Sequence, residues 1–322
     1  MKVCIFSIAL LMAISSQAQR LVPASVSFRL VDDSDVPVEN AAVTGSFLDD
    51  SLSGSSSRFN GMTDSNGMFV AKGFAMLGVH ARFTREGYYN TTHEQWIEGI
   101  RRKDVQVLKQ SNRWDPGVQV VLRPMKQQIS MFINEVETIK LKRTSTNRLD
   151  RYILSHVAIL DLFKDDAMHP HGSGLESDLE FHWKMDIYSM DTDRLAKDYD
   201  TRCEICLPKG MNGIRKGTPY GSENGQTGSA FISDYEAPEA GYTNSISFYR
   251  NVRGSKVETN DDKHYLYYFR IRTQTNELGQ VTNAFYGKIY GQLNGNFTYY
   301  LNPTPNDRNV EHDPKKNLFK GQ

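Results

Sequence analysis

Cysteine is scarce in this 322-residue sequence, and neither sign of charge predominates. Three cysteines are too few for a disulfide scaffold, so the stability of the fold must come from packing. Lysine and arginine together number 38, as do aspartate and glutamate. This balance argues against the strongly basic surface of a nucleic-acid-binding protein, so we expect no nucleic-acid partner.

Several local catalytic signatures are also missing. The sequence has no His-Glu-x-x-His motif of a zinc peptidase, no Gly-x-Ser-x-Gly nucleophile elbow, no Walker loop and no dinucleotide-binding Gly-x-Gly-x-x-Gly. These absences exclude local signatures only, because a carboxylate pair assembled from distant strands leaves no motif. From the sequence we assign no catalytic residue, no cofactor and no metal site.

The amino terminus has the pattern of an export signal. Met1-Lys2 gives a positive start, and an apolar run follows from Val3 to Ile14. Ser16-Gln17-Ala18 then places small residues where a signal peptidase reads them. We expect residues 1–18 to be cleaved near Ala18 and the mature protein to be secreted or periplasmic. No later apolar run is long enough to span a membrane, so we expect no transmembrane segment.

Residues 19–125 are predicted to form an all-β sandwich. Ser25 to Leu30 alternates polar and apolar residues, which is the period of a half-buried strand. Thr63 to Gly67 has the composition of a tight turn, and Gly78 to Phe83 alternates again. Short strands with turn chemistry between them are typical of a β-sandwich.

Four short motifs follow one another along this half of the sequence. They are Pro37-Val38-x-Asn40-Ala41-x-Val43, Thr63-Asp64-x-Asn66-Gly67-x-Phe69, Gly87-Tyr88 and Leu122-x-Pro124. In this order they resemble the carboxypeptidase regulatory-like domain, a transthyretin-like β-sandwich of exported bacterial proteins. The resemblance implies an accessory or interaction module without catalytic residues of its own. Asn40 departs from the usual glycine, and Trp96 to Asp115 resembles an insertion before the last strand.

Residues 126–322 are predicted to form a second, β-rich domain. Asp178 to Ile187 alternates most regularly, with Trp183 on its apolar face. His264 to Thr275 and Val281 to Tyr290 are expected to form a hairpin. Arg148 to Lys164 fits either a helix or strands, whereas Lys209 to Gly228, with six glycines, is predicted to be a long polar loop.

The second half is also similar in wording to a family of exported proteins from Verrucomicrobia, Lentisphaerae and Planctomycetes. The segments that carry the similarity are Ala237-Pro238-Glu239-x-Gly241-Tyr242, Tyr268 to Thr273, Ala284-x-Tyr286-Gly287-Lys288-Ile289-x-Gly291 and Tyr299 to Asn309. This resemblance implies export and brings no activity with it.

Cys203-Glu204-Ile205-Cys206 has several interpretations. It can be a redox pair, a zinc site completed by two of three histidines, a local disulfide, or two separate thiols. The three histidines are His169, His171 and His182. A strand would point the two thiols to opposite faces, whereas a turn would let them bridge. The alternation of Cys203, Ile205 and Leu207 favours the strand.

The sequence supports two functional hypotheses. The preferred one is a non-catalytic binding or cell-envelope-associated protein, whose partner is an envelope polysaccharide or another envelope protein. Its candidate ligand surface consists of aromatic side chains: Trp183, Tyr220 and Tyr242. The alternative is a secreted hydrolase with its catalytic site in the second domain. Its candidate groups are Glu180, His182, Asp186 and Glu239.

Overall fold

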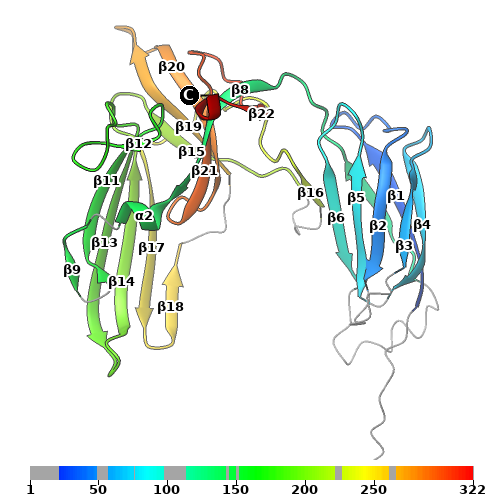
Figure 1. Ribbon diagram of the computed structural model, residues 1–322, viewed down its shortest axis with the longest axis horizontal. Coiled ribbons are helices and arrows are strands. Elements are labelled where there is room, and N and C mark those ends of the chain that lie inside the picture. Colours follow the sequence, from blue (N-terminus) through cyan, green and yellow to red (C-terminus); the bar gives the residue numbers. More distant parts are fainter. Residues whose placement is uncertain are drawn as a thin grey trace, which may run out of the picture. The chain divides into compact units, whose positions relative to one another are not determined.

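The computed structural model describes residues 22–48, 57–75, 77–97, 114–142, 145–149, 152–221, 227–260 and 266–321. Nearly all of its regular structure is strand, which confirms the mainly-β prediction (Figure 1). The expected signal peptide, residues 1–18, lies outside the described residues. In the described part of the chain, no helix is long and apolar enough to cross a membrane.

The chain divides into two units. The first comprises Met1–Pro124 and Glu223–Gly228, and the second comprises Met125–Ser222 and Ser229–Gln322. The return of Thr227 and Gly228 to the first unit was not predicted from the sequence.

The first unit is built from two sheets. One has the order β4-β1-β7 and the other the order β16-β6-β5-β2-β3. The strands are β1 (Val22–Val31), β2 (Ala42–Leu48), β3 (Arg58–Met62), β4 (Met68–Ala75), β5 (Gly78–Thr84), β6 (Thr91–Trp96), β7 (Gly117–Val121) and β16 (Thr227–Ser229). In β5, Val79, Ala81 and Phe83 are completely buried, whereas the residues between them are exposed. This alternation gives the unit its core.

The turn motifs of the first unit have clear local roles. The hydroxyl of Thr63 donates to the carbonyl of Val38 at 2.7 Å and accepts from the backbone N–H of Ala41 at 2.9 Å. Gly67 has a φ of +72°, and a Cβ there would lie 2.3 Å from the carbonyl oxygen of Leu30. Asn40 also adopts a positive φ, +55°, as a glycine at that position would.

The predicted loop between Lys209 and Gly228 contains two strands, so that prediction was wrong in part. Gly213–Lys216 forms β15, which pairs with β19, and Thr227–Ser229 forms β16. The hydroxyl of Thr227 lies 2.8 Å from Nδ1 of His93 on β6. Such short edge strands depend on their partners and carry little signal of their own.

Two six-stranded sheets make up most of the second unit. The sheet that contains β13 has the order β12-β11-β13-β14-β17-β18, and the sheet that contains β20 has the order β15-β19-β20-β21-β8-β22. We call them the β13 sheet and the β20 sheet. The strands of the β13 sheet are β11 (Ser155–Asp161), β12 (Asp166–Ala167), β13 (Leu179–Met190), β14 (Ala196–Cys206), β17 (Ser245–Arg253) and β18 (Lys256–Thr259).

The strands of the β20 sheet are β8 (Ile129–Glu137), β15 (Gly213–Lys216), β19 (Leu266–Thr275), β20 (Val281–Gly291), β21 (Asn296–Leu301) and β22 (His312–Asn317). The remaining elements are short: α2 (Thr138–Lys142), β9 (Arg148–Leu149), β10 (Tyr152–Ile153) and the 3-10 helix η1 (Leu318–Gly321). The segment Arg148 to Lys164 therefore contains strands, because β9, β10 and β11 lie within it, and the helix alternative is excluded.

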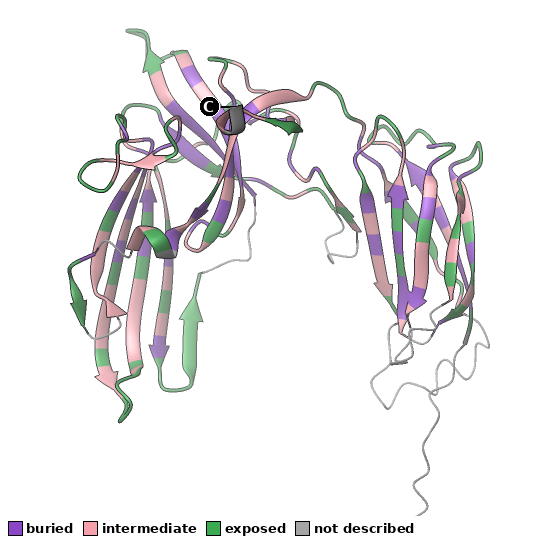
Figure 2. Ribbon diagram, viewed as in Figure 1, coloured by how far each residue is buried: buried purple, intermediate pink, exposed green. Residues whose placement is uncertain are grey.

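The two sheets differ in how far their faces are buried. The β20 sheet is buried on both sides at its centre, where six consecutive residues of β19, Leu266 to Ile271, are buried. The β13 sheet has one buried face and one polar face, as the banded burial of β13 and β14 shows (Figure 2). Phe181 and Trp183 belong to the core between the sheets. We call the opposite, polar side the outer face of the β13 sheet.

Candidate functional site

A groove of about 560 Å³ lies on the outer face of the β13 sheet. We call it the outer groove. Its lining includes eight outward-facing side chains from four neighbouring strands: His182 and Lys184 of β13, Arg202 and Glu204 of β14, Ser247, Tyr249 and Asn251 of β17, and Glu258 of β18. A volume of this size falls in the range of about 300–1,000 Å³ that is typical of ligand sites.

Strand register arranges these side chains in rows across the sheet. His182 lies opposite Glu204, which in turn lies opposite Ser247. In the next row Lys184 lies opposite Arg202, which lies opposite Tyr249. Each row therefore crosses three strands, and cross-strand neighbours of this kind have Cβ atoms about 4.5–5.5 Å apart.

The outer groove mixes hydrogen-bond donors and acceptors of both signs of charge. The Nζ atom of Lys184 lies 3.0 Å from a carboxylate oxygen of Asp186, and Nε2 of His182 lies 3.4 Å from Oε2 of Glu180. Arginine, lysine and amide groups donate, whereas carboxylates and hydroxyls accept. A ligand rich in hydroxyl groups, each both donor and acceptor, matches such a surface.

The candidate carboxylates of the hydrolase alternative are not paired across a cleft. Glu180, His182 and Asp186 share one strand, where Glu180 and Asp186 are about 20 Å apart at 3.3 Å per residue. Glu239 is exposed in the segment that follows Ala237, a residue of the separate core on the far side of the β20 sheet.

Two carboxylates that do face each other across neighbouring strands are Asp186 and Asp200, which are register partners. Asp200 is already bound by Arg253, through contacts of 2.8 and 3.0 Å, and by the hydroxyl of Tyr188 at 2.9 Å. The hydrogen bonds from Arg253 hold the pKa of Asp200 below its usual range. A general acid needs the opposite shift, so Asp200 is not suited to that role.

The three aromatic residues proposed from the sequence do not form one surface. Trp183 is only 7% exposed and belongs to the core between the two sheets. Tyr242 packs against the core on the far side of the β20 sheet, and its hydroxyl donates to the carbonyl of Pro238 at 2.8 Å. Tyr220 is 36% exposed. The outward-facing aromatic side chain of the outer groove is instead Tyr249, which was not predicted as a site residue, whereas Trp183 and Phe248 border the groove from the buried face.

Cys203 and Cys206 are free thiols on β14. Cys203 is buried in the core between the sheets, whereas Cys206 is half-buried and lies opposite Glu180 on β13. Residues three apart on a strand point to opposite faces, so the thiols do not bridge here. Burial raises the pKa of Cys203 to about 12, which makes it a poor nucleophile.

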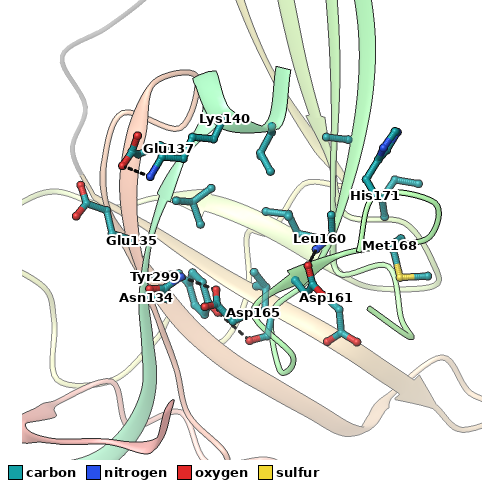
Figure 3. Close-up of a pocket in the computed structure, with 17 residues that line it drawn as sticks. Asn134, Glu135, Glu137, Lys140, Leu160, Asp161, Asp165, Met168, His171 and Tyr299 are labelled. Atoms are coloured by element: carbon teal, nitrogen blue, oxygen red, sulfur yellow. Dashed lines mark hydrogen bonds and ion pairs between the residues drawn. The ribbon is translucent and has the colours of Figure 1, made fainter. Parts of the chain in front are cut away.

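A second cavity, of about 310 Å³, lies between β8, α2 and the loop after β11 (Figure 3). We call it the inter-sheet pocket. Three of its carboxylates already accept hydrogen bonds. Asp165 accepts from Tyr299 and Asn134, Asp166 accepts from the backbone and hydroxyl of Ser173, and Asp161 accepts four backbone N–H groups. These carboxylates shape loops and are not available to a substrate.

No set of three or more His, Cys, Asp or Glu side chains is arranged to hold a metal ion among the residues described. His171 and His182, two of the proposed zinc ligands, lie in different places: His182 faces the outer groove, whereas His171 lines the inter-sheet pocket. The zinc-site interpretation therefore finds no support in the positions of these two histidines.

Comparisons with known proteins leave the family open. No family model matches the sequence, and no curated protein matches it. Among solved structures, the 3-chlorocatechol 1,2-dioxygenase of Rhodococcus opacus is 13% identical, with a TM-score of 0.27 over 34% of this chain and 62% of that chain. The catechol 1,2-dioxygenase of Acinetobacter radioresistens is 15% identical, with a TM-score of 0.27 over 35% and 55%.

A protein of Bacteroides uniformis, provisionally described as carbohydrate-binding, matches over more of the chain. It is 9% identical, with a TM-score of 0.20 over 86% of this chain and 95% of that chain. This chain spans less than two thirds of the two dioxygenase chains. All three TM-scores lie below 0.5, so the functional argument depends on the geometry of the site.

Proposed function

We propose that this chain is an exported, non-catalytic protein that binds a polysaccharide of the cell envelope through the outer groove. The observation that carries the proposal is the uncovered polar face of the β13 sheet, where eight polar or aromatic polar side chains line a cavity of about 560 Å³. The outer groove offers many hydrogen-bonding groups, and the candidate carboxylates Glu180 and Asp186 do not face each other across it, which suits binding better than bond cleavage.

Tyr249 is the residue expected to contribute most to the contact with a sugar ring. It is half-buried, so it combines a fixed position with an accessible face. Its backbone is held on both sides, because its N–H donates to the side chain of Asn260 at 2.6 Å and its carbonyl accepts from the hydroxyl of Thr259 at 2.8 Å. Aromatic rings held in this way provide contact area at little cost in entropy.

Export is supported by the pattern of residues 1–18, and the first unit is proposed to be an accessory module. That role follows from the resemblance of its motifs to the carboxypeptidase regulatory-like domain. In this arrangement the second unit holds the ligand, whereas the first supports folding or attachment.

The test is a sedimentation assay of the full mature chain with cell-envelope material and insoluble polysaccharides. The supernatant is analysed for released sugars. We expect retention without release, and Tyr249→Ala is expected to lower the affinity about tenfold, which corresponds to the loss of about 1.4 kcal/mol of contact energy. Tyr220→Ala, an exposed tyrosine outside the groove, is the matched control. Sugar release that Asp186→Asn abolishes would establish the hydrolase alternative instead.

A further inference from the structure

Four basic side chains gather beside the buried face of the β13 sheet, away from the outer groove. Lys142 comes from the end of α2, Arg148 from β9, His156 from β11 and His171 from the loop after β12. Lys142 and His156 contact Trp183, whereas His171 and Arg148 lie near His156. We call this group the cationic cluster.

Ring contacts define the geometry of the cationic cluster. The rings of His156 and Trp183 are nearly parallel, at an interplanar angle of 9° and a centroid separation of 5.9 Å. The ring of His171 lies 6.1 Å from that of His156. Lys142 places its Nζ atom 4.8 Å from the centre of the Trp183 ring. Cationic or potentially cationic groups therefore gather around one indole.

Burial and the neighbouring basic groups disfavour the protonated form of His156, and burial disfavours that of Lys142. Burial lowers the pKa of His156, and the nearby His171, Arg148 and Lys142 lower it further, against a hydrogen bond with the backbone of Leu141. Burial also lowers the pKa of Lys142, and only Cys203 opposes that effect. Among the described residues, no carboxylate forms an ion pair with Lys142 or His171. These two side chains therefore have no counter-ion within the described part of the chain.

Trp183 adds a buried donor to the same place. Its side-chain nitrogen Nε1 is buried and has no hydrogen-bond partner among the described residues. A buried N–H without an acceptor costs about 1–3 kcal/mol. The indole is more than nine-tenths buried and has Lys142 over its ring. Among the described residues, Lys142 has no ion pair and the indole N–H has no hydrogen-bond acceptor.

The cluster is reachable from solvent. His171 is exposed and also lines the inter-sheet pocket, so it belongs to both. Ala158, the residue two positions after His156 on the same face of β11, lines the pocket as well. A small group that enters the inter-sheet pocket therefore arrives beside the cluster.

We propose that the cationic cluster is a binding site for a small oxyanion, a phosphate, sulfate or carboxylate group, held by Lys142, His156, His171 and the indole N–H of Trp183. An oxyanion supplies both the negative charge and the acceptor lone pairs that Lys142 and the indole lack. The site lies on the buried face of the β13 sheet, opposite the outer groove, although Trp183 borders both, and its occupant is either a free anion or an acidic group on a larger ligand.

Isothermal titration of the full mature chain with inorganic phosphate, sulfate and glucuronate tests the proposal at low ionic strength. We expect saturable binding of at least one of them with a dissociation constant near or below about 1 mM. Saturation by the inorganic ions indicates a free anion, whereas preference for glucuronate indicates an acidic sugar. In a parallel titration followed by NMR, one of the three indole N–H signals should shift downfield.

Variants give the decisive comparison. Lys142→Met is expected to weaken binding at least tenfold. Lys140→Met, two positions away on α2, exposed and paired with Glu137 at 2.7 Å, is expected to change binding less than twofold. Trp183→Phe removes the N–H donor together with part of the ring that contacts His156 and Lys142, and the shifted indole signal should be the one that disappears. The proposal is overturned if no anion binds saturably, or if Lys142→Met and Lys140→Met bind equally well.

Discussion

Arg272 and the cationic cluster represent two opposite ways of holding charge in the second unit. Arg272 donates to Asp161 at 2.7 Å and to Asp178 at 3.0 Å, and both carboxylates are almost completely buried. Its guanidinium also lies 4.3 Å from the centre of the Phe163 ring. In the cationic cluster, by contrast, Lys142 and His171 have no carboxylate partner among the described residues.

This difference separates a structural group from a candidate site. The carboxylates around Arg272 are also satisfied by the backbone: Leu162 donates to Asp178, and Leu175 is one of the donors to Asp161. Nothing in that network is left for a ligand. In the cationic cluster, by contrast, Lys142 has no ion pair and the buried Trp183 N–H has no acceptor among the described residues, so both can still bind a ligand.

Removing Arg272 should destabilise the protein more than any other single change proposed for this comparison. Arg272→Met leaves Asp178 and Asp161 buried without their cation, and breaking a buried pair in this way costs about 3–5 kcal/mol. We expect a loss of that size in the free energy of unfolding at pH 7, measured by urea denaturation. The loss should shrink at lower pH, because burial already raises the pKa of Asp178 and its protonation removes the unpaired charge.

Arg253→Met is the matched control for this change. Arg253 also binds an aspartate through two nitrogens, at 2.8 and 3.0 Å, but the pair lies on the surface. Exposed ion pairs contribute little because water already solvates both charges. If both variants lose the same stability, the distinction between buried and exposed pairing is wrong for this protein.

His312 provides a second measurement of how much stability is lost when a basic side chain is buried beside a second basic side chain. Burial and the nearby Lys288 lower the pKa of His312 to about 4, although Asp313 opposes the shift. The unfolded chain takes up this proton near pH 6.5, so the stability is complete above pH 6.5 and is lost as the pH falls toward 4. We expect a loss of about 2–3 kcal/mol over that range.

The comparison variant for this pH dependence is His312→Gln. All other titrating groups remain in it, so the difference between the two stability curves isolates the histidine. The difference in the free energy of unfolding between wild type and variant should not change with pH above 6.5. Below pH 6.5 any advantage of the wild type should become smaller or change sign. Parallel curves down to pH 4 would contradict the assigned pKa.

Alternation along the chain was enough to predict much of this fold. Trp183 was placed on the apolar face of β13, and the hairpin of β19 and β20 was expected, because a two-residue period identifies long strands. Gly213–Lys216 was missed because that strand forms only by pairing with β19. Its glycine-rich surroundings, taken alone, predict a loop.

The candidate sites were harder to predict than the strands. The rows of the outer groove depend on strand register, and Tyr249 meets Arg202 only because β14 pairs with β17. Lys142, His156 and His171 are separated along the chain and belong to different elements. A local sequence pattern cannot show that residues so far apart in the chain lie close together. The position of Trp183 could be predicted because the apolar alternation that identifies its strand also shows which face it occupies.

Removing Lys142 should have a much smaller effect on stability than removing Arg272. Lys142→Met relieves a partly buried charge without an ion-pair partner among the described residues, and it removes one cation–π contact with Trp183. These effects oppose each other, so the free energy of unfolding should stay within about 1 kcal/mol of wild type. The pKa of His156, followed by NMR, should rise because one neighbouring positive charge is gone. A loss as large as that of Arg272→Met would mean that the cluster is structural.

The smallest expected effect concerns the reactivity of Cys203, the thiol nearest the cationic cluster. Lys142 lowers the pKa of Cys203, but burial outweighs it and brings the pKa to about 12, so less than about one part in a thousand is thiolate at pH 8. In native protein, iodoacetamide should modify half-buried Cys206 first and spare Cys203, with both modified after unfolding. Cys206→Ser should abolish native labelling, whereas Cys203→Ser should not. Rapid labelling of Cys203 would show that the cluster activates a nucleophile, and would favour chemistry over anion binding at this end of the β13 sheet.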